Sequence, residues 1–229
     1  MKKVSFYLVP IIICILSSNC RKDDDIKYGK DTITDAGKNN YNTVNIGTQV
    51  WMAENLKVTK FRNGDPIPNV TDSTEWSNLT TPAYCWYNND EGNYKDTYGA
   101  LFNWYTVKTG DLCPEGWHIP TDAEWTTLTT YLGGEVTAGG KLKETGTSHW
   151  FSPNTGATDE TGFTARPGGY RYREHNIKFY SMGYAGLWWS CTEYDDLYAR
   201  GRNMVFNLTD ANRGIIPKKS GVSVRCIKD

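Results

Sequence analysis

The sequence predicts an α+β domain in which many short strands are joined by long loops. Helical periodicity is confined to about two stretches of the 229-residue chain, while Gly, Asn and Thr punctuate the rest. Aromatic residues make up 14% of the chain, with nine Trp and fifteen Tyr, and no repeat of about 20–50 residues is found. These observations favour one domain, with at most a stalk attached.

The clearest helix is predicted over residues 122–132. Thr121 and Glu124 form a capping box, in which the hydroxyl accepts from the Glu124 amide and the carboxylate accepts from the Thr121 amide. An apolar stripe follows, made of Trp125, Leu128 and Leu132. Gly133-Gly134 supplies a left-handed end. An earlier helix is predicted at about 97–108, with one face formed by Leu101, Trp104 and Tyr105.

The first 25 residues predict export and a lipid anchor. Lys2 and Lys3 precede an apolar run, Phe6–Leu16. This run is too short to span a bilayer, which takes roughly 20 apolar residues, but it suits a secretory signal. The following Ser-Ser-Asn-Cys, ending at Cys20, resembles a bacterial lipobox, whose cysteine is diacylated on sulfur and becomes the new N-terminus. The alternative is a plain signal peptide with an accidental cysteine.

This resemblance implies a signal peptide at 1–19, an acidic flexible tether at 20–40 and a folded domain at 41–229. Each buried methylene contributes about 0.8 kcal/mol, so several fatty acyl chains on Cys20 would hold the chain on a membrane. The charged run at 21–25, Arg-Lys-Asp-Asp-Asp, resembles the export signal of lipoproteins displayed on the outer cell surface. We therefore expect an outer-membrane lipoprotein that faces outward.

Charge and hydropathy exclude two classes of partner. The 25 Lys and Arg nearly balance the 26 Asp and Glu, and no basic stripe indicates nucleic-acid binding. No second apolar run predicts a membrane span. The membrane contact is thus expected through the lipid alone.

Four cysteines remain in the domain once the signal and the lipid site are set aside: Cys85, Cys113, Cys191 and Cys226. An exported chain meets oxidising conditions, so disulfides are allowed, and four cysteines can pair in three ways. No C-x-x-C spacing is present, which argues against zinc or thioredoxin-like chemistry.

The central block 113–134 resembles the helix start of formylglycine-generating-enzyme-like domains, which share the C-type-lectin-like fold. A closer resemblance is to the Fib_succ_major domain of bacterial surface lipoproteins. It covers about residues 40–229 and is carried by "GTQVWMAENLK" (47–57), "AYCWYNND" (83–90), "YGALFNWY" (98–105), "CPEGWHIPTDAEW" (113–125), "GGKLKETGT" (139–147), "GFTARPGGYR" (162–171), "WWSCTEY" (188–194) and "SVRC" (223–226).

The resemblance implies a C-type-lectin-like fold, with a twisted, mostly antiparallel sheet flanked by two helices and long loops. Because chain ends pair in such folds, it also implies a Cys113–Cys226 disulfide. A loop of more than 100 residues closed in this way is stabilised by at most about 4–5 kcal/mol. Cys85 and Cys191 are either a second bridge or two buried thiols.

A catalytic constellation is not found. The three histidines, His118, His149 and His175, are far apart in the sequence and lack a nucleophile or metal motif. We expect His118 to be a hydrogen-bonded turn residue and the other two to lie in exposed loops. The formylglycine-generating enzymes use a reactive cysteine pair, for which Cys191 and Cys226 are the candidates here.

No cofactor is expected, although calcium deserves consideration because C-type lectins bind sugars through it. The oxygen-rich candidates are Asn88, Asn89, Asp90 and Glu91, and Glu193, Asp195 and Asp196. The lectin tripeptides are missing, and an EF-hand fails because its first ligand would be Tyr87. We expect solvated turns at both places, and no metal site.

Aromatic residues suggest a ligand surface. Six tryptophans in the family motifs are expected in the core, namely Trp51, Trp104, Trp117, Trp125, Trp188 and Trp189; because Trp188 and Trp189 alternate on a strand, at least one is expected to point outward. Flat rings beside hydrogen-bonding groups suit sugars or a protein partner. The candidate ligand-binding residues are Tyr170, Arg171, Tyr172, Arg173, Tyr180, Tyr184 and Trp189. The alternative is that these tyrosines merely complete a small core.

The sequence therefore predicts a surface lipoprotein with a non-catalytic binding or adhesion domain, whose partner is a glycan or an envelope protein. One alternative is an enzyme related to the formylglycine-generating or polysaccharide-active proteins. Another is a structural component of the envelope.

Overall fold

The structure, a computed structural model, describes residues 28–172 and 179–229 together with Met1. In this part of the chain, two five-stranded sheets form the framework. The first sheet has the order β1-β2-β3-β12-β6, with strands Tyr28–Thr34, Asn40–Ile46, Gln49–Met52, Ile227–Lys228 and Trp117–His118. The second has the order β11-β10-β9-β7-β8, with strands Asn212–Pro217, Tyr198–Val205, Ala185–Glu193, Gly168–Arg171 and Phe179–Met182.

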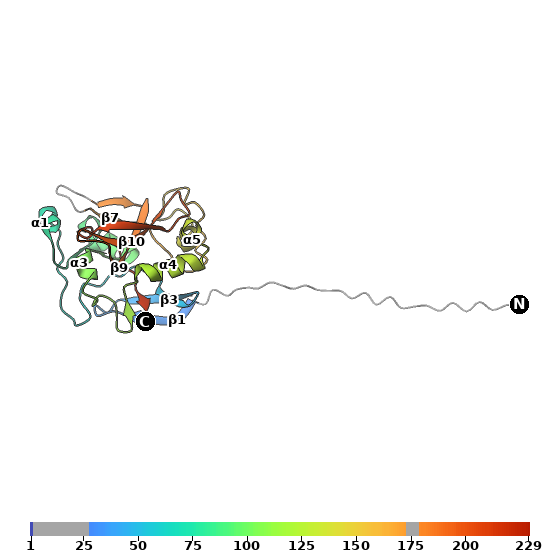
Figure 1. Cartoon of the computed structure of the whole chain (residues 1–229), viewed down its shortest axis with the longest axis horizontal. Helices are drawn as coiled ribbons and strands as arrows, with labels where there is room; N and C mark the ends of the chain where they lie inside the picture. The colour runs from blue at the N-terminus through green and yellow to red at the C-terminus, as the bar shows by residue number, and fades with distance from the viewer. Residues whose placement is uncertain (2–27, 173–178) are drawn as a thin grey trace.

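Short helices and a small sheet complete this framework. The small sheet pairs β4 (Tyr84–Cys85) with β5 (Leu101–Phe102). The helices are α1 (Ser73–Asn78), the 3-10 turn η1 (Tyr87–Asn89), α2 (Glu91–Tyr98), α3 (Trp104–Val107), α4 (Asp122–Tyr131) and α5 (Glu135–Leu142). In Figure 1, α4 and α5 lie together beside the second sheet, and the C-terminus lies against β1 and β3 of the first.

The α+β class is confirmed, but the expectation of one sheet flanked by two helices was wrong. The described residues form two large sheets and five α-helices, and the strand pairs are antiparallel apart from β7 with β9. Four of the strands are only two residues long: β4, β5, β6 and β12. Segments this short carry no detectable alternation of apolar and polar residues, so periodicity could not predict them.

The C-terminal segment joins the two sheets. Backbone carbonyls of residues 222–226 accept amide hydrogen bonds from Phe102, Trp189, Leu56 and Met52 in turn, at 2.8–3.0 Å. These donors belong to both large sheets, the small sheet and the loop after β3. The segment therefore lies between the two large sheets. The two residues that follow it form β12, which pairs with β3 on one side and with β6 on the other.

Helix α4 confirms the predicted capping box. Thr121 Oγ1 accepts from the Glu124 amide at 3.1 Å, and Glu124 Oε2 accepts from the Thr121 amide at 2.8 Å. The predicted apolar stripe is buried, and Gly133 and Gly134 both have positive φ angles. The local signals at this helix were strong enough to fix it without tertiary information.

The helix predicted over 97–108 was wrong, because the chain breaks at Gly99. That residue has φ 74° and ψ −170°, and a Cβ there would lie 2.7 Å from the carbonyl oxygen of Leu56. Helix α2 ends just before it, and the next residues form β5. Asn103 then caps the separate helix α3 by accepting from the Thr106 amide at 3.0 Å. The spacing of apolar residues across this stretch comes from two unrelated elements.

Strand β9 runs between two hydrophobic clusters, so both of its adjacent tryptophans are buried. Trp189 packs with the cluster around Phe102 and Val224, and Trp188 packs with the cluster around Trp125 and Phe163. Each ring is 0% exposed. The expectation that one of them points outward was wrong, because each face of the strand is covered by its own part of the core.

The folded part begins before residue 41. Strand β1 lies within the predicted tether 20–40 and pairs with β2, from Tyr28 opposite Val44 to Thr34 opposite Asn40. The tether prediction is therefore too long at its C-terminal end. The lipidation site at Cys20 lies outside the described residues. Among those residues, no helix is long and apolar enough to span a membrane.

Candidate functional site

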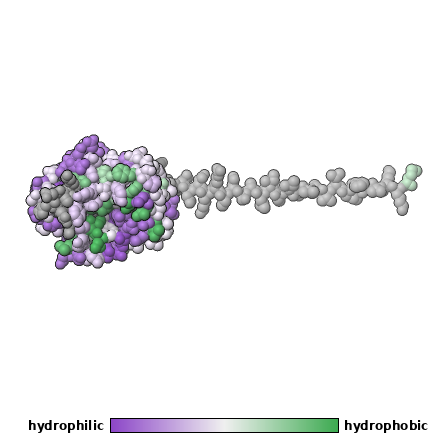
Figure 2. All heavy atoms as spheres, turned by 90° about the horizontal axis from the view of Figure 1, so that it is seen from above, coloured by the Kyte–Doolittle hydropathy of each residue, from purple (hydrophilic) through white to green (hydrophobic). Residues whose placement is uncertain are grey.

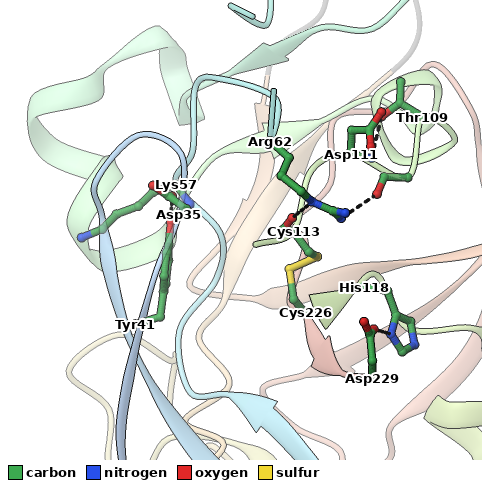
Figure 3. The surroundings of a disulfide bond; sticks show 11 residues. Asp35, Tyr41, Lys57, Arg62, Thr109, Asp111, Cys113, His118, Cys226 and Asp229 are labelled. Carbon is green, nitrogen blue, oxygen red and sulfur yellow. Dashed lines mark hydrogen bonds and ion pairs between the residues drawn. A yellow bond between two sulfur atoms is a disulfide. The ribbon is translucent and has the colours of Figure 1, made fainter. Parts of the chain in front are cut away.

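The predicted Cys113–Cys226 disulfide is confirmed, with Cα atoms 6.0 Å apart. It fastens the loop before β6 to the residue preceding β12. Arg62 supports the same loop, because its Nε donates to the Cys113 carbonyl at 2.9 Å and its Nη2 donates to the Gly110 carbonyl at 3.1 Å (Figure 3). The bridge therefore braces the frame of the domain.

The possible second bridge is absent, since Cys85 and Cys191 are both free thiols. Cys85 is fully buried, and burial raises its pKa to about 11 despite the nearby Arg171. Burial, followed by the charge of Glu124, raises the pKa of the half-buried Cys191 as well. A cysteine nucleophile needs a lowered pKa, so neither thiol has the electrostatic setting of a reactive cysteine.

His118 lies in strand β6 rather than in a turn, and it bridges two carboxylates. Its Nδ1 lies 2.6 Å from Asp229 Oδ1 (Figure 3). Its Nε2 lies 2.9 Å from Glu124 Oε1. Burial lowers the pKa of His118, but the hydrogen bonds to Asp229 and Glu124 outweigh burial, so its pKa is raised. His149 is half-buried rather than exposed and contacts Glu144 at 2.6 Å. His175 lies outside the described residues.

The acidic clusters considered for calcium serve local structure. Asp90 caps helix α2 by accepting from the Asn93 amide at 3.1 Å. Glu193 forms an ion pair with Lys218, and Asp195 accepts from the amides of Leu197 and Tyr198. In the described part of the chain, no group of three or more His, Cys, Asp or Glu side chains is arranged to hold a metal ion.

The candidate ligand-binding residues do not form one surface. Tyr170 contacts both Tyr172 and Tyr180, with ring centroids 6.4 and 5.9 Å away. Tyr184 instead packs on Phe206, at 4.8 Å, in a separate aromatic group. Exposed apolar residues are scattered, and the face in Figure 2 shows several small hydrophobic patches separated by hydrophilic residues. Arg173 lies outside the described residues.

Two of the candidates are part of the core, which corrects their assignment. Trp189 is fully buried, and its Nε1 donates to the Phe102 carbonyl at 2.8 Å. Arg171 is 1% exposed and stacks 4.4 Å from the Trp76 ring centroid. Its guanidinium donates to three consecutive backbone carbonyls, those of Val70, Thr71 and Asp72. Trp189 is thus closed to a ligand, whereas the guanidinium of Arg171 is held by structural contacts beside a separate pocket that it lines with Asp72 and Phe179.

A polar groove lies elsewhere, where the loop after β3 meets the end of α2 and the loop before β7. It consists of two adjoining pockets of about 230 and 210 Å³ that share Glu54, Asn55, Thr97 and Arg166. The first is also lined by Asn42, Ala53, Gly162, Thr164 and Arg225, and the second by Asn40, Lys57, Asp96 and Gly99. We call these residues the polar groove. No aromatic residue lines the polar groove, and its largest apolar side chain is that of Ala53.

The charged walls of the polar groove are held in fixed positions. Glu54 accepts from the backbone and side-chain amides of Asn42, at 2.9 and 2.6 Å. Arg166 pairs with Glu144 at 2.9 Å and also donates to the Thr97 carbonyl. These contacts leave carboxylate, amide, hydroxyl and guanidinium groups around a cavity that opens to solvent.

The floor of the polar groove is formed by Asn55 and Arg225, both buried. Asn55 Oδ1 accepts from Arg225 Nη2 at 2.9 Å and from Trp188 Nε1 at 2.8 Å, while its Nδ2 donates to the Tyr98 carbonyl at 2.9 Å. Arg225 lies over the Phe163 ring, with Cζ 3.9 Å from its centroid, and donates to the Phe163 carbonyl. This buried network fixes the shape of the floor.

Comparison with known proteins assigns the family. A model of the Fibrobacter succinogenes major domain matches residues 44–228, which is most of the chain. The chain belongs to the Fibrobacter succinogenes major domain family. No curated protein and no solved structure matches it.

The matched range of the Fibrobacter succinogenes major domain contains all of the polar groove except Asn40 and Asn42. The sequence alone did not predict this groove, although the segments that form it belong to the family motifs. Asn55, Arg166 and Arg225 stand in "AENLK", "TARPGG" and "SVRC", which served there only as marks of the family. An arginine and an asparagine in segments of otherwise buried residues are the signal that could have singled them out.

Proposed function

We propose that this domain is a non-catalytic binding module that holds a hydroxyl-rich ligand, one sugar unit of a glycan, in the polar groove. The observation that carries the proposal is the lining of the groove, which offers hydrogen-bond donors and acceptors and no large apolar side chain. Drug-sized ligands occupy mostly apolar pockets of about 300–1,000 Å³. A smaller polar pocket suits a compact group with many hydroxyls.

Binding is favoured over catalysis by the state of the reactive groups. Both free thiols have raised pKa values, which makes them poor nucleophiles. His118 is held between two carboxylates, neither of which is a nucleophile that it could activate. Cys226, one of the pair considered for formylglycine-type oxidation, is already used in the disulfide.

The same proposal includes how the domain is displayed. We infer a lipid on Cys20 that anchors the chain in the outer membrane, with the folded part facing outward and partners drawn from glycans or envelope proteins. We also propose that the fold is a variant of the C-type-lectin-like fold. The support is that the C-terminal strand lies in a sheet with β3 and is tied by a long-range disulfide.

Binding of the purified full chain to a glycan array tests the proposal. We expect one glycan class to bind, and Glu54→Ala to weaken binding about tenfold through loss of about 1.4 kcal/mol. Glu75→Ala is the matched control, because this glutamate lies in the first turn of α1, outside the groove. Binding should survive EDTA, because the proposed contacts are hydrogen bonds from the lining side chains and involve no metal.

The tyrosine surface is the competing location. If Tyr180→Ala or Tyr184→Ala abolishes binding while Glu54→Ala does not, the ligand binds at those exposed rings and the groove assignment is wrong. If no glycan binds at all, the proposed ligand class is wrong. Oxidation of a cysteine-containing peptide by the full chain in the presence of copper would replace the binding proposal with an enzymatic one.

A further inference from the structure

Arg225 is a buried cation without an acidic partner. Its side chain is 1% exposed and lines the first pocket of the polar groove. Three of its N–H groups donate to protein oxygens, two to Asn55 Oδ1 and one to the Phe163 carbonyl. A guanidinium has five N–H groups, so two have no acceptor among the described residues. All three bonds go to neutral groups, and none goes to a carboxylate.

The other charges of the polar groove have partners. Arg166 pairs with Glu144 at 2.9 Å, and Lys57 pairs with Asp96 at 2.9 Å. Glu54 is bound by both amide groups of Asn42. Among the described residues that line the groove, Arg225 is thus the one cation that no carboxylate contacts.

A buried charge is costly unless it is paired and hydrogen-bonded. Burial lowers the pKa of Arg225 to about 9, while the more distant charges of Glu54 and Asp159 act in the opposite direction. The rings of Phe163 and Trp188, with centroids 3.9 and 6.0 Å from Cζ, compensate in part. A charge left in this state beside a cavity is stabilised by any anion that enters the cavity.

We propose that the polar groove recognises an acidic sugar, a uronic acid, whose carboxylate binds Arg225 while its hydroxyls bind the groove walls. This inference rests on the proposed function, because it assigns the ligand class to the same groove. Arginine binds carboxylates through strong, charge-assisted hydrogen bonds. Glu54 lines the same pocket, so its charge acts against a bound anion; its oxygens accept from Asn42 and can also accept from sugar hydroxyls.

The test compares D-glucuronate with D-glucose. Glucuronate carries a carboxylate at the position where glucose carries a hydroxymethyl group. Each sugar is titrated into the full chain, and the NMR signal of the Arg225 Nε–H is followed. We expect glucuronate to shift this signal and to bind about tenfold more tightly than glucose, a difference of about 1.4 kcal/mol. Equal affinities, an unmoved Arg225 signal, or no binding of either sugar would overturn the inference.

Variants at Thr97 give the matched control. Replacing Arg225 itself can unfold the domain, because its guanidinium holds Asn55 and Phe163. Thr97 is half-buried and lines the same pocket, so Thr97→Asp supplies a competing carboxylate and Thr97→Asn supplies a neutral side chain of the same size. We expect Thr97→Asp to remove the preference for glucuronate and Thr97→Asn to keep it. A preference unchanged by Thr97→Asp contradicts the proposal.

The two proposals fail in different ways. If glucose and glucuronate bind in the groove with equal affinity, the sugar-binding function stands and the acidic class is wrong. If glucuronate binds through Arg225 but no glycan is retained on the array, the anion site stands and the glycan-binding function is wrong.

Discussion

Trp188 and Trp189 are neighbours on β9, yet their indole rings lie in different hydrophobic clusters on opposite sides of the strand. Trp188 Nε1 donates to Asn55 Oδ1 at 2.8 Å, and Trp189 Nε1 donates to the Phe102 carbonyl at 2.8 Å. One strand therefore connects the core beneath the polar groove with the core around the disulfide.

Each of these tryptophans should be essential for stability. Trp188→Ala and Trp189→Ala are each expected to lower the free energy of unfolding by about 3–5 kcal/mol, because a large buried ring is replaced by a cavity. Urea unfolding measures this loss, with Tyr184→Ala as the control at an exposed ring. A loss of less than about 1 kcal/mol for Trp189→Ala would contradict its burial.

The disulfide should stabilise the domain through its long loop. The bonded cysteines are 113 residues apart, so the chain-entropy model gives at most about 4–5 kcal/mol. Cys113→Ser with Cys226→Ser should lower the free energy of unfolding toward that value, whereas Cys191→Ser should cost little. Thiol titration of the unfolded native chain should find Cys85 and Cys191 free within the domain, and a domain with no free thiol would contradict the structure.

The sequence predicted best where local chemistry decides the structure. The capping box at Thr121 and the glycine pair after α4 act through neighbouring residues, and both were correct. The Cys113–Cys226 pairing and the family came from resemblance rather than from residue patterns. The prediction for 97–108 failed because tertiary contacts at Gly99 override a helical spacing of apolar residues.

The candidate site could not be predicted for a related reason. Asn55 lies more than 100 positions before both Arg166 and Arg225 in the sequence, and only the fold brings these groove residues together. Arg171 was expected at a binding surface because an arginine among tyrosines resembles one. Its guanidinium donates hydrogen bonds to three backbone carbonyls that are distant in the sequence, and no sequence pattern predicts such contacts.

Gly99 should tolerate no side chain. Its φ of 74° with ψ of −170° is a conformation essentially restricted to glycine, and a Cβ would meet the Leu56 carbonyl oxygen at 2.7 Å. Gly99→Ala should therefore lower the free energy of unfolding by about 1–3 kcal/mol or more. Gly110 is the matched control, because its φ is 76° and a Cβ there meets nothing within 4 Å. Equal losses for the two alanine variants, measured by urea unfolding, would show that the close approach at Gly99 is unimportant.

His118 should make stability depend on pH. Both ring nitrogens face carboxylate oxygens, and only the protonated ring can donate to Asp229 and Glu124 together. Burial opposes protonation, but the two hydrogen bonds prevail, so the folded-state pKa lies above the unfolded value of about 6.5. The stabilisation is thus fully present below about pH 6.5 and is lost as pH rises through the raised pKa of the folded state.

The difference in free energy of unfolding between the native chain and His118→Gln measures this contribution. We expect the difference to be largest below about pH 6.5 and to decline as the pH rises above it. Asp229→Asn should shift the NMR titration of His118 toward lower pH, because one of the two carboxylate acceptors is lost while Glu124 remains. The half-buried Cys191 titrates well above this range, since its pKa is raised, so it does not obscure the effect. A difference that stays constant with pH would mean that the ring does not donate to both carboxylates.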